Sequence, residues 1–76
     1  MIKIDLKLFA TLAKHLPEDS ECFEVPDNTN VAKLIYDLGI EPGAVKLIFI
    51  NGKKQDGKYL LKNGDRVGLF PPVGGG

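Results

Sequence analysis

A single amphipathic helix, flanked on both sides by strand patterns, limits most strongly how this chain can fold. In "PDNTNVAKLIYDLG", apolar residues recur at helical spacing and form one stripe. These residues are Val31, Leu34, Ile35 and Leu38. Asn30 or Thr29 can supply the N-cap oxygen, and Gly39 suits the left-handed position that ends a helix. A helix of about two turns covers only one face of a small sheet, so strands must supply the rest of the core.

The other apolar runs are typical of strands. "IKIDLKLF" (Ile2–Phe9) alternates with a period of two, which predicts a strand with one buried face, although Phe9 departs from its polar side. "ECFEV" (21–25) resumes the alternation after a connector that has room for a short helical turn. We therefore expect the first two strands to form a hairpin with a long loop.

The second half of the chain contains two further strand patterns. "VKLIFI" (45–50) is apolar almost throughout, which predicts a strand covered on both sides or deep in the sheet. Asn51-Gly52 predicts a tight turn, "YLL" (59–61) predicts a short strand or a turn, and 63–65 predicts a turn before the last strand, "RVGLF". The sequence predicts an α+β domain at 1–70, with one helix across a mixed sheet of four to five strands, followed by a flexible tail at 71–76.

Composition restricts the function classes. The chain has 76 residues, which is one domain without room for a deep catalytic pocket. Its 10 basic and 10 acidic residues give no net charge, which argues against nucleic acid as the main partner. A lone cysteine and the lack of a membrane-length apolar run predict a cytoplasmic protein that does not bind a membrane.

Charge is divided unevenly along the chain. Residues 1–45 hold four lysines and eight acids (4 − 8 = −4), and residues 46–76 hold five lysines, one arginine and two acids (6 − 2 = +4). Two interpretations stay open: ordinary solvated faces, or a basic rim that attracts an acidic partner. The candidates for that rim are Lys53, Lys54, Lys58, Lys62 and Arg66.

Catalytic groups are scarce. His15 is the only histidine, so a histidine pair for a metal ion does not exist. Cys22 lies in a strand pattern, with no helix N-terminus or second histidine evident to activate it as a nucleophile, so we interpret it as a small strand residue. The terminal glycines have no helix after them, so they cannot form a phosphate loop of the usual kind. We expect no catalytic residues, no metal site and no bound cofactor.

The tail "PPVGGG" has a different use. Pro71 and Pro72 fix the backbone dihedral φ and favour an extended chain, whereas the glycines that follow lack Cβ and can pass through a narrow channel. The tip therefore presents one functional group, the α-carboxylate of Gly76.

These features resemble a known family. "ING" at 50–52, "LLKNGDRVGLFPPVGGG" at 60–76 and the order of strands and helix are similar to the MoaD/ThiS sulfur carriers, which are ubiquitin-like β-grasp proteins. The resemblance covers essentially the whole chain. The Pro-Pro-Val lead-in is most like the MoaD branch, the small subunits of molybdopterin synthase. The family's terminal Gly-Gly falls on Gly75 and Gly76, and Gly74 takes the variable position before it.

The resemblance implies a carrier and not an enzyme. A ubiquitin-activating-type enzyme would adenylate Gly76 with ATP, and a sulfur donor would convert it to a thiocarboxylate. Residues 71–75 (Pro71, Pro72, Val73, Gly74 and Gly75) would then lead it into the large synthase subunit, which builds the dithiolene of molybdopterin. Sulfur supply for thiamine or cysteine synthesis, and conjugation to lysines as a protein modifier, remain alternatives.

Docking is expected on the open face of the sheet. Phe9 interrupts the polar side of the first strand and Phe70 lies where the domain meets the tail. Leu60 or Leu61 could complete an apolar patch with them, and exposed aromatic residues of this kind mark interfaces. The alternative is that both phenylalanines belong to the core.

Overall fold

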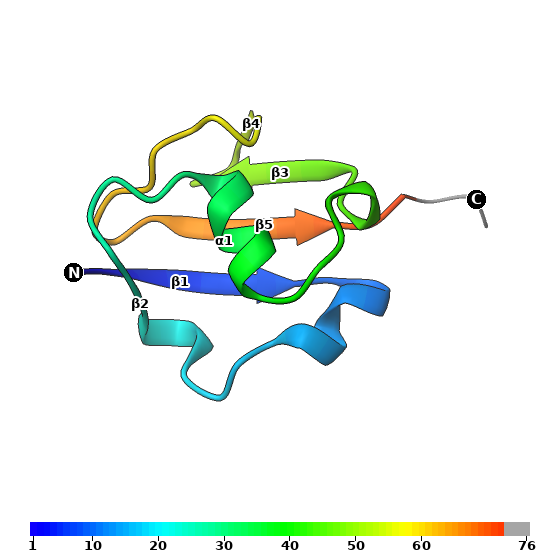
Figure 1. The fold of residues 1–76 in the computed structure, drawn as a ribbon, viewed down its shortest axis with the longest axis horizontal. Helices are drawn as coiled ribbons and strands as arrows, with labels where there is room; N and C mark the ends of the chain where they lie inside the picture. The colour runs from blue at the N-terminus through cyan, green and yellow to red at the C-terminus, as the bar shows by residue number, and fades with distance from the viewer. Residues whose placement is uncertain (73–76) are drawn as a thin grey trace.

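The structure of the protein is a computed structural model that describes residues 1–72. Five strands form one mixed sheet in the order β2-β1-β5-β3-β4. Their bounds are β1 Ile2–Leu8, β2 Phe23–Val25, β3 Leu47–Ile50, β4 Lys53–Gln55 and β5 Arg66–Phe70. β1 and β5 run parallel, and the other neighbouring strands run antiparallel. One α-helix, α1 (Val31–Asp37), lies across one face of this sheet (Figure 1), which confirms the predicted α+β architecture.

Two of the connections contain short 3₁₀ helices. The 3₁₀ helices η1 (Ala10–His15) and η2 (Ser20–Cys22) lie between β1 and β2, and η3 (Pro42–Ala44) precedes β3. The predicted hairpin with a long loop is confirmed, since Ile2 lies opposite Val25. The predicted strand at 21–25 is too long at its start, because Cys22 ends η2 and is exposed.

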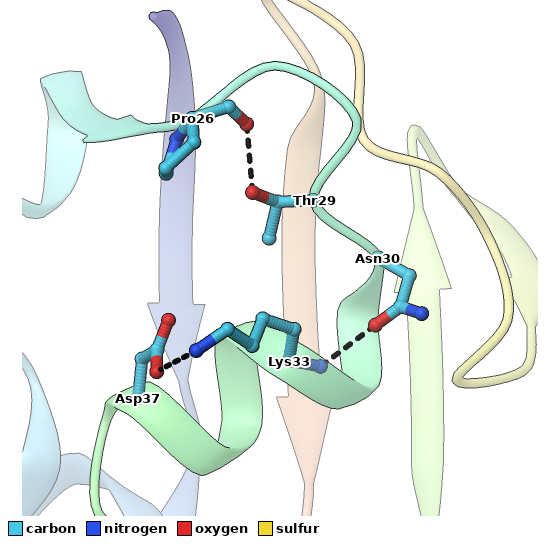
Figure 2. Close-up of polar contacts among 5 residues, drawn as sticks. All are labelled: Pro26, Thr29, Asn30, Lys33 and Asp37. Atoms are coloured by element: carbon cyan, nitrogen blue, oxygen red, sulfur yellow. Dashed lines mark hydrogen bonds and ion pairs between the residues drawn. The ribbon is translucent and has the colours of Figure 1, made fainter.

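Two side chains stabilise the start of α1 and the loop that precedes it (Figure 2). The Asn30 side chain accepts a hydrogen bond from the Lys33 backbone N–H at 2.8 Å, so Asn30 is the N-cap. The Thr29 hydroxyl instead donates to the Pro26 carbonyl at 2.7 Å and fixes the loop that enters the helix. Of the two candidates in the sequence, Asn30 satisfies the otherwise unpaired helix donor.

The helix ends as the sequence predicts, at Gly39. Gly39 has φ +79°, a left-handed conformation that costs glycine nothing. Its N–H donates to the Tyr36 carbonyl, and the Ile40 N–H donates to the Ile35 carbonyl. This pair of bonds is a Schellman motif, and the burial of Ile35 and Ile40 supplies its usual apolar contact.

The core lies between α1 and the sheet face that the helix covers. Period-two alternation turns alternate residues of each strand toward the helix, and the register aligns Leu8 and Leu69 as neighbours. The buried apolar residues are Ile4, Leu6, Leu8, Leu12, Val25, Val31, Leu34, Ile35, Ile40, Ile50, Leu61, Val67 and Leu69. Each such side chain stabilises the fold by roughly 1.5–3 kcal/mol, so a domain of this size depends on nearly all of them.

Two predictions for the second half need correction. β4 (Lys53–Gln55) was not expected, because it has no apolar alternation; it pairs with β3 because Asn51 and Gly52 form the turn, with φ +54° and +83°. Of the two alternatives for 45–50, the inner position is confirmed, since β3 lies between β5 and β4, but β3 is not covered on both sides, since only Ile50 in it is buried. The "YLL" segment contributes an isolated bridge between Leu60 and Asn30.

The predicted tail begins where β5 ends. Pro71 is half-buried and Pro72 is exposed, and both follow Phe70 directly. The rest of the tail, residues 73–76, lies outside the described residues. Because β1 and β5 are parallel, the tail leaves the sheet at the end of β1 and not at the end that holds Met1 (Figure 1).

Candidate functional site: an aromatic hollow on the open sheet face

Three phenylalanines gather on the face of the sheet that α1 does not cover. Phe9 directly follows β1, and its N–H donates to the Leu69 carbonyl at 3.2 Å, so it continues the pairing of β1 with β5. Alternation places Phe9 and Phe70 on the side opposite the buried Leu8 and Leu69. Phe49 joins them from β3, where it lies opposite Gly68.

The rings contact one another in two geometries. Phe9 and Phe70 stack with their centroids 4.2 Å apart and 3° between the ring planes. Phe49 meets Phe70 edge to face, at 5.5 Å and 84°. Aromatic pairs of this kind contribute about 0.5–1.5 kcal/mol each beyond the area they bury. Even so, 39% of the Phe9 surface remains exposed.

The rings form the walls of an open hollow of about 480 Å³, called here the aromatic hollow. Gly68 provides its floor between the rings, and Lys7 and Arg66 also line it. The lining is mainly apolar carbon with two cationic side chains beside it. A surface of this composition on a small domain is typical of a protein interaction site.

The charges around the aromatic hollow are mostly positive. The ion pairs found in residues 1–72 join the N-terminus to Asp27 and Lys33 to Asp37, so neither uses Lys7 or Arg66. Asp5 lies opposite Arg66 in the strand register, and its Oδ1 atom is buried without a hydrogen-bond partner.

Only part of the predicted basic rim borders the hollow. Arg66 lines it, and Lys54 lies across from Phe49 on the neighbouring strand. Lys53, Lys58 and Lys62 are exposed but do not line it.

A buried carboxylate fixes the strand that carries Gly68 and Phe70. Asp65, just before β5, is 5% exposed and accepts hydrogen bonds from the Asn51 side-chain amide, the Tyr59 hydroxyl and the Lys62 backbone N–H, at 2.9, 3.1 and 2.9 Å. Asn51 in turn accepts from the Arg66 N–H at 2.9 Å. Burial, together with the hydrogen bond to Asp65, raises the pKa of the Tyr59 hydroxyl. The network thus holds the start of β5 against the β3–β4 turn.

The structure separates the predicted docking residues. Phe9 and Phe70 lie together in the aromatic hollow. Leu61 is 4% exposed and belongs to the core, so its expected place in an exposed patch is wrong. Leu60 is exposed, but it pairs with Asn30 near the helix start and does not line the hollow.

Sequence reasoning missed Phe49 and Gly68. Phe49 was hidden in a run that is apolar on both faces, and Gly68 has no side chain to signal a site. Only the strand register, which places both opposite each other, could have found them.

Groups that could act as catalysts are dispersed. Within residues 1–72 no cluster of three or more His, Cys, Asp or Glu residues could hold a metal ion. His15 is half-buried at the end of η1, and Cys22 is exposed at the end of η2. The predicted reacting group, Gly76, and the tail residues Val73, Gly74 and Gly75 lie outside the described residues. Across that same described stretch, no helix has the length and apolar character needed to cross a membrane.

Solved structures with the same fold include archaeal proteins. A candidate molybdopterin converting factor subunit 1 from Pyrococcus furiosus is 28% identical, with a TM-score of 0.72, over 96% of this chain and 100% of that chain. The Haloferax volcanii protein HVO 2177 is 30% identical, with a TM-score of 0.75, over 99% and 87%. The H. volcanii small archaeal modifier protein 1, at 20% identity and a TM-score of 0.70 over 96% and 100%, shares the fold.

A search of curated proteins found no match. The family model named ThiS family matches residues 6–76, which is nearly the whole chain. The five-stranded mixed sheet with one covering helix is the ubiquitin-like β-grasp fold of these neighbours. The chain therefore belongs to the ThiS family, the small ubiquitin-like sulfur carriers of the ThiS/MoaD type.

Proposed function

We propose that this protein carries sulfur as a thiocarboxylate on Gly76 and donates it in molybdopterin synthesis, as the small subunit of a molybdopterin synthase. The family match, which extends to residue 76, is the observation that carries the proposal. The Pro-Pro-Val lead-in and the likeness to the P. furiosus protein support the molybdopterin branch. The chain needs no cofactor of its own in this role, because the adenylating partner uses the ATP.

The chemistry requires little from the carrier itself. A carboxylate oxygen of Gly76 attacks the α-phosphorus of ATP, and pyrophosphate leaves. A nucleophilic sulfur donor then attacks the acyl carbon, and AMP leaves with the oxygen, so that sulfur replaces one oxygen. The adenylating enzyme and the large synthase subunit supply the catalytic groups. The carrier supplies the acyl group and a surface on which each partner can position it.

The aromatic hollow is the docking surface in this proposal. Phe70 belongs both to its wall and to the end of β5, so a partner bound there lies beside the start of the tail. A tail of six residues, 71–76, then reaches at most about 20 Å from the docked domain. This distance sets how far an adenylating or synthase active site can lie from the docking surface.

An intact-mass measurement tests the proposal. The purified protein is incubated with a family adenylating enzyme, ATP and sulfide, and the mass is expected to rise by the difference between sulfur and oxygen. The product is then mixed with a molybdopterin synthase large subunit and the pterin precursor, and the dithiolene product is measured. Lysine-linked adducts with other proteins would instead favour a protein modifier. A thiocarboxylate that forms but yields no dithiolene would favour thiamine or cysteine synthesis.

A further inference from the structure

Gly68 occupies an unusual place for a glycine. It lies within the central strand of the sheet, where glycine weakens a strand because it has no side chain to pack. Its backbone does not need glycine, since the described glycines with positive φ are Gly39, Gly52 and Gly64. A glycine of this kind marks a place where another molecule approaches the backbone closely.

The surroundings of Gly68 show what a side chain there would do. A Cβ atom added to Gly68 would lie 3.5 Å from Cε2 of Phe9 and 3.6 Å from Cε1 of Phe70. These are ordinary van der Waals distances, so the methyl group fits without displacing either ring. It would, however, occupy the floor of the aromatic hollow. The absence of a side chain at this position therefore keeps the hollow deep.

The shape of the hollow favours a protein segment over a free small molecule. Small-molecule sites usually enclose about 70–90% of the ligand surface. The aromatic hollow is an open depression on one sheet face, so a small ligand in it would stay largely exposed, whereas a side chain of a docked protein would be covered by the rest of that protein. The three rings around Gly68 match an apolar side chain, which would gain both burial and close packing there.

The charges define what flanks that side chain. Lys7 and Arg66 line the hollow and take part in neither of the ion pairs found in residues 1–72. Asp5 is the acidic residue that the register places beside Arg66. Lys7 lies beside Gly68 in the strand register and Arg66 precedes Gly68 by two residues, so carboxylates next to an apolar anchor would meet the two cations, whereas basic residues would be repelled.

We propose that the aromatic hollow receives one apolar side chain from an acidic segment of a partner protein, with Gly68 setting the depth to which it enters. The inference rests on the proposed function, because it names the segment by which a partner would hold the carrier. It makes Gly68 a residue that determines specificity: the open floor selects partners with a long apolar anchor, and Lys7 with Arg66 selects those whose anchor has acidic neighbours.

Peptide titrations followed by NMR test the proposal with the full-length protein. The probes are three capped peptides: Asp-Glu-Leu-Glu-Asp, the same peptide with a central alanine, and Lys-Lys-Leu-Lys-Lys. The leucine-acid peptide is expected to shift the backbone amides of Phe9, Phe49, Gly68 and Phe70. The alanine peptide should bind more weakly, and the basic peptide should leave these amides unchanged. Equal responses to the acidic and basic peptides, or no shift up to the solubility limit of the acidic leucine peptide, would overturn the proposal.

Gly68→Ala and Gly43→Ala form a matched pair of variants. Both positions lack a positive φ, and a Cβ at Gly43 meets nothing within 4 Å. Gly68→Ala should weaken the leucine-acid peptide about fourfold, the equivalent of one methylene kept out of the hollow, and Gly43→Ala should not weaken it. Equal affinity in Gly68→Ala, with an unchanged fold by NMR, would contradict the role of Gly68.

The titrations do not use the carboxylate chemistry of Gly76. Peptide binding without sulfur transfer would therefore support the peptide-binding role of the aromatic hollow and contradict the proposed function. Sulfur transfer without peptide binding would support the proposed function and contradict the peptide-binding role of the hollow.

Discussion

The rings of Phe9 and Phe70 lie face to face, 4.2 Å apart, although the two residues come from opposite ends of the chain. The contact exists because β1 and β5 are parallel neighbours and both residues follow a buried leucine. The parallel pairing of the first and last strands thus builds the surface from which the tail departs.

Alanine substitutions of the two rings should differ in their effect on stability. Phe70→Ala loses ring contacts with both Phe9 and Phe49, whereas Phe9→Ala loses only the stacked contact. We expect Phe70→Ala to lower the free energy of unfolding by about 2–3 kcal/mol and Phe9→Ala by about 1 kcal/mol. Urea unfolding of both variants and of the double variant measures these values and the coupling between the rings. Two equal single-variant losses with no coupling would contradict the stacked arrangement.

The Asp65 network should be the most sensitive polar feature of the fold. Asp65→Ala removes the acceptor for three donors, two of them side chains on Asn51 and Tyr59. We expect a loss of roughly 2–4 kcal/mol in the free energy of unfolding, since three hydrogen bonds to a buried carboxylate are lost at once. Asp56→Ala is the control, because Asp56 accepts one exposed bond from the Lys58 N–H and should cost under about 1 kcal/mol. Similar losses of unfolding free energy in the two variants would show that Asp65 stabilises the fold no more than an exposed carboxylate does.

Tyr59 should make the fold sensitive to alkaline pH. Its pKa is raised from 10.0, by burial first and then by the hydrogen bond it donates to Asp65, so the folded state holds the hydroxyl proton more tightly than the unfolded state. The stability that this provides is fully present below pH 10.0 and is lost as the pH rises through the pKa of the folded protein. As the pH rises above 10.0, the free energy of unfolding should therefore fall more steeply in the wild type than in Tyr59→Phe.

The same shift can be observed directly. The chain has two tyrosines, so Tyr36→Phe leaves Tyr59 as the sole source of tyrosinate absorbance. Its titration midpoint should lie above that of the same variant unfolded in urea. Equal titration midpoints in the folded and unfolded protein would show that Tyr59 is not the cause of the loss of stability at alkaline pH.

The sequence predicts some features of this structure and misses others. Features that depend on local chemistry were predicted: the N-cap was placed at Asn30 or Thr29 and is Asn30, Gly39 ends the helix, and Asn51-Gly52 forms a hairpin turn. β4 was missed because its pairing depends on that turn and not on its own polar residues. Local patterns thus predict the helix, the turns and the α+β architecture, whereas the pairing of the strands depends on contacts between distant parts of the chain.

The candidate site was predicted only in part, for a related reason. Phe9 could be found because it breaks the alternation of the first strand, and Phe70 because it lies where the domain meets the tail, but their contact requires the parallel pairing of β1 with β5. Leu60 and Leu61 could not be assigned from the sequence, since adjacent leucines in an irregular segment give no period. The structure buries Leu61 in the core and leaves Leu60 exposed, where it forms a bridge with Asn30 at the helix start.

Deletion of Gly76 tests the reacting group itself. Among residues 1–72, the last member of the buried core is Leu69, so deletion of Gly76 should change the free energy of unfolding by no more than about 0.5 kcal/mol. If the Gly76 carboxylate is the acyl group, the deletion should abolish sulfur transfer although the fold is kept. Adding one alanine after Gly76 should be equally damaging, because it moves the carboxylate and places a Cβ at a tip that is otherwise glycine. Intact mass after incubation with adenylating enzyme, ATP and sulfide measures both variants.

The matched control for these tail variants is Phe9→Ala, which leaves the tail intact and removes one wall of the aromatic hollow. It should raise the carrier concentration needed for half-maximal sulfur transfer, because docking is weaker, and should still reach full conversion at high concentration. The deletion should fail at every concentration, since no docking strength restores a missing acyl group. A shortened chain that gains sulfur on Gly75 at the normal rate would show that the partner reads any terminal glycine, and Gly76 would then lose its assigned role.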